Sequence, residues 1–364
     1  MTPPHTTHNP TTRNPRPCGL GRSATLLAVA SLVLGVPGCA QPKGVLFEPL
    51  DSPLSWPPPP EAARIDYVGE LRTDKDLKPG RSFFAGMGES LFGAEPAHAM
   101  RTPFACCTDG GDRLFVADSN AHTVHVFDLQ TRRYEQWTPE EPAAFAQPVA
   151  VAYDPAGRLL VADSVAGVIH AFDEGGRYTG TLGEGLLERP TGIAVDPTNE
   201  RLFVADAAAH EVVVLTPAGG LIRRLGERGT QPGQFNFPTG VAVGPGGSLY
   251  VSDTLNFRVQ VFDAALNPVL QIGSKGDLPG YFSHPKGIAL NSAGHLYVVD
   301  SHFESVQIFD RQGRLLLTFG EEGPGPGQFW MPTGVHIDAD DRVWVTDSYN
   351  QRVQVFDYRS EEGP

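Results

Sequence analysis

Short runs of hydrophobic residues, separated by polar turns, recur along most of this chain. In residues 342–357, RVWVTDSYNQRVQVFD, one such run ends at Asp347, a polar turn follows, and a second run begins at Val353. Short apolar runs rich in valine and aromatic residues and bounded by polar turns are typical of β-strands, so this stretch predicts two antiparallel strands joined by a short loop. Five similar stretches precede it, at residues 113–128, 158–173, 201–216, 248–263 and 295–310.

Each copy is flanked by two further predicted strands, which gives a unit of four. A segment of the form Pro-x-x-apolar-x-apolar precedes every copy, as in PTGVAV at 238–243, and an apolar segment such as VLQIG at 269–273 follows most of them. We name the four strands a, b, c and d in chain order. The aspartate that ends strand b recurs every 43 to 47 residues, a period typical of the blades of a β-propeller. A single blade cannot bury both faces of its sheet, so the blades must pack against one another.

The sixth copy has no strand d after it, and the missing strand is predicted at the other end of the chain. Residues 64–69, RIDYVG, resemble residues 315–320, LLLTFG, which form strand d of the fifth unit, yet they precede the first unit. We therefore expect the segment around Tyr67 to lie beside the last strand, which contains Phe356, and to close the ring. The predicted fold is all-β: a six-bladed β-propeller of four-stranded blades.

These units resemble NHL repeats, most closely in the fourth and sixth blades. Both blades combine a Pro-x-Gly start of strand a with the aspartate turn, an Asn three residues later and Arg-Val-x-Val-Phe in strand c. Both also follow a Gly-Gln-Phe-x-x-Pro linker, at 233–238 and 327–332. The resemblance covers residues 62–358 and implies an NHL-repeat propeller of the bacterial lipoprotein type. The other blades replace the Arg, with Thr123, Val168, Glu211 and Ser305.

The first 38 residues are predicted to be a signal peptide. Three arginines precede an apolar run at 24–38, which is shorter than the about 20 residues that a membrane-spanning helix needs. Cys39 follows directly, in a context that resembles the site where bacterial lipoproteins are cleaved and lipid-modified. We expect cleavage before Cys39, its lipidation and a location in the bacterial cell envelope, with the lipid as the sole membrane contact. Ala40 after the cysteine favours the outer membrane, and secretion without a lipid is the alternative.

Three segments flank or interrupt the predicted propeller. Residues 39–61, with four consecutive prolines at 57–60, are predicted to be an extended tether. Residues 73–100 form a Gly- and Phe-rich insert before the first blade, which we expect to be a short helix or a plug across one face of the ring. Residues 359–364 form a short tail.

The composition indicates a folded, acidic protein and excludes two classes of partner. Hydrophobic residues make up 40% of the chain, and its 41 Gly and 33 Pro suit many short strands and turns. The net charge of −14 argues against a nucleic-acid partner and against direct binding to anionic membranes, because both need basic patches. Cys106 and Cys107 are neighbours on a predicted strand and point to opposite faces, so we expect two small buried side chains and no disulfide.

The aspartates at the ends of the b strands have a predicted structural role. Their carboxylates can accept backbone N–H bonds within the b–c loop. Asn256 and Asn350 are expected to adopt positive φ there, and Arg258 and Arg352 to reach a neighbouring carboxylate or carbonyl group. The six predicted turn aspartates are Asp118, Asp163, Asp206, Asp253, Asp300 and Asp347.

The candidate chemistry favours binding over catalysis, with a metal-dependent enzyme as the alternative. Peptidyl-amidoglycolate lyases, which resemble this chain, hold zinc with histidines from different blades, and gluconolactonases hold a metal with an acidic cluster. Here His122, His210 and His302 fall in the b–c loops of alternate blades, His336 on the last strand a has no evident partner, and no acidic cluster lies on a strand a. We therefore expect no catalytic residue, no cofactor and no metal.

We expect instead a non-catalytic protein- or peptide-binding or scaffold module. The binding residues should lie on the face built from the b–c loops and the d–a linkers, because aromatic side chains ringed by polar residues on rigid loops suit a protein or peptide partner. The predicted binding residues are Phe257, Arg258, His302, Phe303, Trp330, Tyr349 and Arg352.

Overall fold

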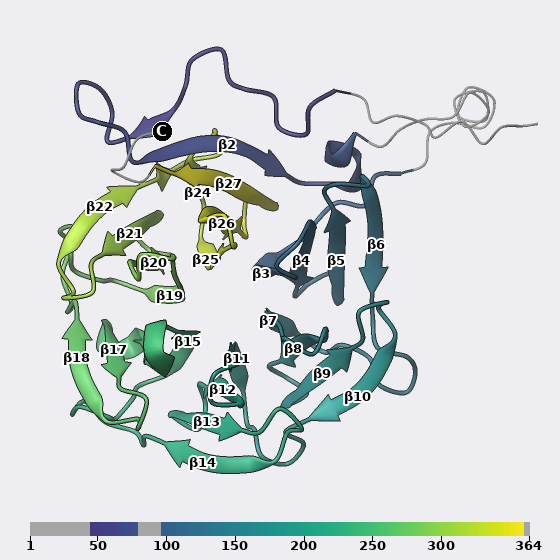
Figure 1. Cartoon of the computed structure of the whole chain (residues 1–364), viewed down its shortest axis with the longest axis vertical. Coiled ribbons are helices and arrows are strands. Elements are labelled where there is room, and N and C mark those ends of the chain that lie inside the picture. The colour runs from purple at the N-terminus through teal and green to yellow at the C-terminus, as the bar shows by residue number, and fades with distance from the viewer. Residues whose placement is uncertain (1–43, 79–95, 360–364) are drawn as a thin grey trace, which may run out of the picture. The chain divides into compact units, whose positions relative to one another are not determined.

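The structure, a computed structural model, describes residues 44–78 and 96–359, which form six blades around a central axis (Figure 1). The predicted all-β, six-bladed propeller is confirmed. Each of the first five blades takes four consecutive antiparallel strands from the chain, with a nearest the axis and d outermost. Their strands are β3 (Pro103–Thr108), β4 (Arg113–Asp118), β5 (Thr123–Asp128) and β6 (Arg133–Trp137); β7 (Pro148–Tyr153), β8 (Leu159–Asp163), β9 (Val168–Phe172) and β10 (Tyr178–Leu182); β11 (Pro190–Asp196), β12 (Arg201–Asp206), β13 (Glu211–Leu215) and β14 (Leu221–Leu225); β15 (Pro238–Val243), β16 (Leu249–Asp253), β17 (Arg258–Phe262) and β18 (Pro268–Ile272); and β19 (Pro285–Leu290), β20 (Leu296–Asp300), β21 (Ser305–Phe309) and β22 (Leu315–Phe319).

The sixth blade joins the two ends of the propeller chain. Its strands, from a to d, are β25 (Pro332–Ile337), β26 (Arg342–Asp347), β27 (Arg352–Tyr358) and β2 (Ile65–Leu71). β2 runs antiparallel to β27, with Tyr67 paired to Phe356 and their ring centroids 5.7 Å apart, as the closure hypothesis predicted. A short fifth strand, β1 (Ser55–Trp56), pairs with the outer edge of β2.

Parts of the segments next to the ring are also described. Trp56, within the interval predicted as a tether, lies 5.8 Å from Phe319 and 5.9 Å from Phe356, measured between ring centroids. The interval predicted as an insert begins with the 3-10 helix η1 (Asp74–Leu77). Residues 79–95 of that insert, the signal peptide, Cys39 and residues 360–364 lie outside the described residues. The remaining short elements are η2 (Pro245–Gly247), η3 (Thr254–Asn256), β23 (Glu321–Glu322) and β24 (Gln328–Phe329).

None of the helices in residues 44–78 and 96–359 is long and apolar enough to cross a bilayer.

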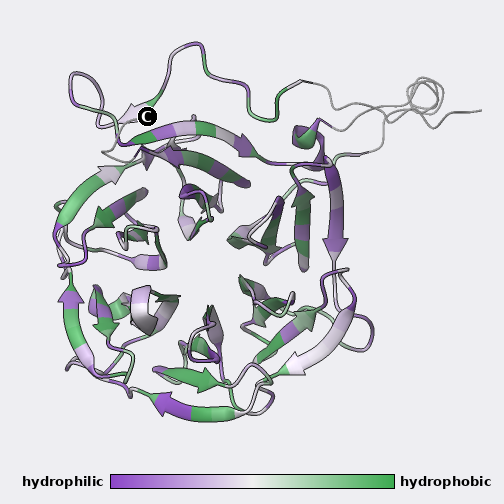
Figure 2. Ribbon diagram, viewed as in Figure 1, coloured by the Kyte–Doolittle hydropathy of each residue, from purple (hydrophilic) through white to green (hydrophobic). Residues whose placement is uncertain are grey.

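The hydrophobic core lies between neighbouring blades, against strands b and c. All residues of β8 and β9 are buried, whereas β14 exposes four of its five residues, and the outer strands mix hydrophobic and hydrophilic positions (Figure 2). The linker phenylalanines Phe235, Phe282 and Phe329 are completely buried. Each packs against the phenylalanine of strand c in its own blade, at centroid distances of 5.9, 5.6 and 6.0 Å. Each also packs against buried residues of the preceding blade, so the linker phenylalanine seals one blade against the next.

The Pro-x-Gly start of strand a brings neighbouring blades into backbone contact around the axis. A Cβ on Gly240 would lie 2.4 Å from the carbonyl oxygen of Lys286, and a Cβ on Gly192 would lie 2.6 Å from that of Thr239. Side chains do not tolerate such distances, so the approach of the strands requires glycine at this position. The channel is consequently narrow: the cavity along it has a volume of about 130 Å³.

Candidate functional site

Each aspartate at the end of strand b holds together the two segments that form the loop face of its blade. In blade five, Asp300 accepts hydrogen bonds from the backbone N–H groups of His302 and Phe303 in the b–c loop, at 3.1 and 3.3 Å. It also accepts those of Ser283 and His284 in the d–a linker, at 2.7 and 2.9 Å. All six aspartates are 0% exposed. The loop face is therefore pre-organised by buried carboxylates that no surface ligand can reach.

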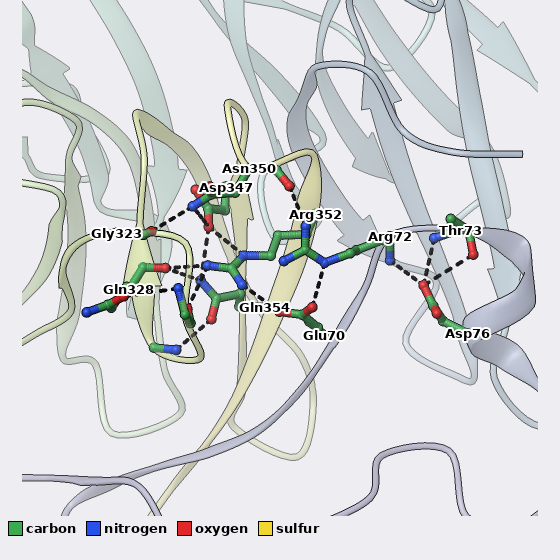
Figure 3. A network of polar contacts seen from close by, with 12 residues as sticks. Glu70, Arg72, Thr73, Asp76, Gly323, Gln328, Asp347, Asn350, Arg352 and Gln354 are labelled. Carbon is green, nitrogen blue, oxygen red and sulfur yellow. Dashed lines mark hydrogen bonds and ion pairs between the residues drawn. The ribbon is translucent and has the colours of Figure 1, made fainter. Parts of the chain in front are cut away.

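In blade six a buried arginine extends this anchor to the N-terminal strand (Figure 3). Arg352 donates from Nε to Asp347 Oδ2 at 2.7 Å and from Nη1 to Glu70 Oε2 on β2 at 2.6 Å. Its Nη2 donates to the carbonyl oxygens of Gly325 and Gln328 at 2.8 and 2.6 Å. One guanidinium thus connects strand b, strand d and the preceding linker.

Blade four contains the corresponding pair, Arg258 with Asp253, at 2.8 Å. Arg258 and Arg352 were predicted as binding residues, but they are 5% and 1% exposed. Their guanidinium groups are directed into the blade, so a partner on the loop face would not contact them. The arginines therefore act on the shape of the loops and not on a ligand directly.

The predicted positive φ at Asn256 and Asn350 is wrong. The residues that follow them, Phe257 and Gln351, adopt it instead, with φ of 58° and 57°. The asparagine side chain is used differently: Asn256 Nδ2 donates to Asp253 Oδ2 at 2.8 Å, and Asn350 makes the same bond in blade six at 2.9 Å. Because the asparagine side chain must donate to the aspartate, the asparagine lies one residue before the residue with positive φ.

Blade one replaces the arginine network with a buried histidine. His125 Nδ1 lies 2.6 Å from the Tyr134 hydroxyl, and its Nε2 lies 3.2 Å from Asp118 Oδ2. Burial alone would raise the pKa of Asp118, but hydrogen bonds from His125 and three backbone N–H groups outweigh it and lower the pKa. The side chains of His125 and Asp118 are both 0% exposed. The His125–Asp118 contact resembles an acid–base pair, but both side chains are shielded from solvent, so we interpret it as a structural contact.

Two aromatic side chains stand out on the loop face. Trp330 in the d–a linker and Tyr349 in the b–c loop of blade six are 52% and 60% exposed, with ring centroids 5.7 Å apart. Their backbones are fixed, because Trp330 N–H donates to Asp347 Oδ1 at 2.8 Å and Tyr349 N–H donates to the Trp330 carbonyl oxygen at 3.2 Å. Leu255, at the position equivalent to Tyr349 in blade four, is 38% exposed. The two predicted aromatic residues thus form one exposed, rigidly held pair.

The other predicted binding residues differ in accessibility. His302, at the position equivalent to Tyr349 in blade five, is exposed, whereas Phe303 and Phe257 are half-buried. The ammonium of Lys275 lies 5.1 Å from the centroid of the Phe257 ring, which it partly covers. The most exposed aromatic side chains are therefore the pair on blade six, followed by Tyr281 in the linker before blade five, which is 43% exposed.

The channel mouth beside blade six carries a lysine that sequence reasoning missed. The second residue of strand a lines the channel in every blade, and in blade five this residue is Lys286. Burial lowers the pKa of Lys286 and of the nearby His284, and it raises the pKa of Glu304. Such clustered shifts are typical of functional sites. The signal in the sequence was one charged residue at this position, Pro-Lys-Gly where three other blades have Pro-Thr-Gly and the remaining two have Pro-Phe-Ala and Pro-Val-Ala.

His336, for which the sequence suggested no partner, has one. Its Nε2 lies 3.2 Å from the backbone nitrogen of Thr108 and 2.9 Å from the Thr108 hydroxyl, which joins blade six to blade one. Burial lowers the pKa of His336 to about 4. Among the described residues, no group of three or more His, Cys, Asp and Glu side chains is arranged to hold a metal ion.

Comparison with known proteins supports the repeat and the fold. Residues 235–262, 282–309 and 329–356, in blades four, five and six, match the NHL repeat. The chain therefore carries NHL repeats in its second half. None of the curated proteins matches its sequence.

Several solved structures share the fold at low sequence identity. A gluconolactonase from Xanthomonas campestris is 17% identical with a TM-score of 0.57, over 80% of this chain and 98% of that one. A virginiamycin B lyase from Staphylococcus aureus is 14% identical with a TM-score of 0.53, over 71% and 96%. An auxiliary nutrient-binding protein from Bacteroides ovatus is 15% identical with a TM-score of 0.57, over 72% and 70%. At these identities the likeness shows the fold alone.

Proposed function

We propose that this chain is a non-catalytic module of the bacterial cell envelope that binds a protein or peptide on the loop face of its NHL-repeat propeller. The observation that carries the proposal is the Trp330–Tyr349 pair. Large aromatic rings that are exposed on hydrogen-bonded loops bury much apolar area when a partner covers them, and they lose little conformational entropy in doing so. The fold shared with an auxiliary nutrient-binding protein is in keeping with a binding role.

The proposal includes export and a lipid anchor on Cys39, most simply in the outer membrane. Its support is the apolar run at 24–38 followed directly by a cysteine. Labelling of growing cells with an alkyne-bearing fatty acid tests this part. We expect the wild-type chain to take up the label and to sediment with outer membranes, whereas Cys39→Ser should do neither. Equal labelling of the two proteins would contradict the anchor.

Capture of envelope proteins by the purified mature protein tests the binding face. We expect a partner that is retained by the wild type and lost by the Trp330→Ala/Tyr349→Ala double variant, because alanine at such positions commonly costs about 2 kcal/mol or more each. The matched control is Val269→Ala, which removes a 60% exposed apolar side chain from the outer strand β18. A partner that is lost equally with Val269→Ala, or retained by the double variant, would contradict the proposed face.

A metal-dependent enzyme is the second candidate, and the fold shared with a gluconolactonase over 98% of that chain favours it. Catalysis of this kind needs several ligands converging on one ion. In the part of the chain that the structure describes, no such group is found. Elemental analysis of the purified protein separates the two candidates: stoichiometric zinc or calcium would favour the enzyme.

A further inference from the structure

The channel mouth holds a charged side chain without a close counter-charge. In the other blades the second residue of strand a is apolar or threonine, whereas blade five has Lys286. Its ammonium forms no hydrogen bond or ion pair with any residue in the described ranges 44–78 and 96–359. It lies 5.8 Å from the centroid of the Phe104 ring. An ammonium that is partly removed from water without a partner costs free energy, so its presence at a channel mouth needs an explanation.

The neighbouring polar groups already have partners. Asp300 accepts four backbone N–H bonds, and Glu304 accepts the backbone N–H of Met331 at 2.6 Å. Both carboxylates influence Lys286 only from beyond ion-pair distance. The hydroxyl of Thr333, on the adjacent strand a, lies 2.7 Å from the Phe104 carbonyl oxygen, to which it donates. A negatively charged ligand group that enters the channel mouth would therefore bind to the ammonium of Lys286.

The size of the channel limits what can enter it. Its cavity of about 130 Å³ is well below the roughly 300–1,000 Å³ of sites that enclose a whole small molecule. The strands of blades five and six approach closely at this level, because a Cβ on Gly287 would lie 2.7 Å from the carbonyl oxygen of Thr333. The mouth therefore suits one terminal group of a longer ligand, whose remainder lies outside on the loop face.

The exposed aromatic pair is directly connected to this mouth. Thr333 lines the channel and follows Trp330 by three residues. Its Oγ1 lies 2.7 Å from the hydroxyl oxygen of Ser348, the residue before Tyr349. A peptide that covers the two rings can thus direct its end toward Lys286 without crossing another blade.

We infer that Lys286 binds the C-terminal carboxylate of the peptide whose apolar residues cover Trp330 and Tyr349. This inference rests on the proposed binding function. A carboxylate fits better than a phosphate, because one ammonium balances one negative charge, while Asp300, Glu304 and the net charge of −14 oppose a second. His284, whose pKa is lowered by burial, and His302 are the other titratable side chains at this mouth.

Three dipeptide probes test the inference by NMR titration of the mature protein: N-acetyl-Phe-Ala with a free carboxylate, its C-terminal amide, and N-acetyl-Phe-Glu amide, which offers a side-chain carboxylate only. We expect the free acid to bind at least about tenfold more tightly than either amide, since a hydrogen bond to a charged group has a large effect when it is removed. Lys286→Met should abolish this preference. Lys275→Met is the matched control, because its ammonium also lies over an aromatic ring but outside the channel.

Each outcome decides the inference. Tighter binding of the free acid that is lost in Lys286→Met and kept in Lys275→Met supports it. Equal binding of acid and amide, or tighter binding of the Glu side chain than of the terminal carboxylate, overturns it. If the probes bind the wild type regardless of their terminus and lose affinity in Trp330→Ala, the inference fails while the proposed function stands. If none binds, the inference fails, and envelope capture decides the proposed function separately.

Discussion

Arg352→Met should strongly destabilise the propeller, because Arg352 holds the closing strand from inside the sixth blade. Its guanidinium donates to Asp347 and Glu70 and to two carbonyl oxygens of the preceding linker, at 2.6 to 2.8 Å (Figure 3). Methionine keeps much of the side-chain length but removes every donor. The Asp347 carboxylate, which is 0% exposed, would lose its cation.

The expected loss is about 3–5 kcal/mol, the usual effect of removing one partner from a buried ion pair. Arg258→Met in blade four is the matched variant, because Arg258 contacts Asp253 and two linker carbonyl oxygens in the same way. Its contact to strand d is the neutral Gln271 of the continuous chain, whereas Arg352 contacts Glu70 of the N-terminal strand. The partly exposed Glu70 contact adds about 1 kcal/mol, so Arg352→Met should have the larger effect.

Urea unfolding followed by tryptophan fluorescence measures both variants, with the buried Trp344 reporting on blade six. We expect the midpoint to fall in both, and further in Arg352→Met. A free energy of unfolding within about 1 kcal/mol of the wild type for Arg352→Met, or a smaller loss than in Arg258→Met, would refute the reasoning.

Three further predictions, two of them with a control variant, use the same unfolding assay. Gly240→Ala should destabilise by about 1–3 kcal/mol, because its Cβ would meet a carbonyl oxygen of the next blade at 2.4 Å, whereas Gly175→Ala, with its nearest atom at 3.5 Å, should be close to neutral; equal effects would contradict the close approach of the strands. His336 has a folded pKa lowered by burial to about 4, below the about 6.5 of an unfolded chain, so stability should fall as the pH drops from about 6.5 to 4, by on the order of 3 kcal/mol. A pH profile that is unchanged in His336→Gln would refute this. Trp56→Ala should lose about 2 kcal/mol, since its half-buried ring contacts the core of the last two blades, whereas Trp330→Ala, on the surface, should leave stability unchanged.

The ring and its closure were predictable because repetition constrains the answer. Six copies of a strand pair, with one strand d missing at one end and one extra at the other, fit a closed six-bladed ring. The pairing of Tyr67 with Phe356 follows from that count. The burial of the linker phenylalanines was predictable for a related reason, since an apolar residue at a fixed place in every linker indicates a shared contact.

The contacts that depend on distant segments could not be predicted in this way. Asp300 receives hydrogen bonds from residues 16 and 17 positions earlier, and Arg352 contacts Glu70, which is 282 positions away. Short-range turn chemistry therefore described half of each aspartate's environment, and it correctly led Arg258 and Arg352 to a carboxylate. It did not show that the fold buries both guanidinium groups. The pairing of His336 with Thr108 escaped for the same reason, because it exists only once blade six meets blade one.

Hydrogen–deuterium exchange of the mature protein, with and without the partner captured from the envelope, tests the central claim most directly. A partner on the loop face should slow exchange in peptides that cover residues 329–333, 284–288 and 348–352, and it should leave the outer strand β18 unchanged. Protection confined to β18 or to the a–b and c–d turns, with no change around Trp330 and Tyr349, would contradict the account.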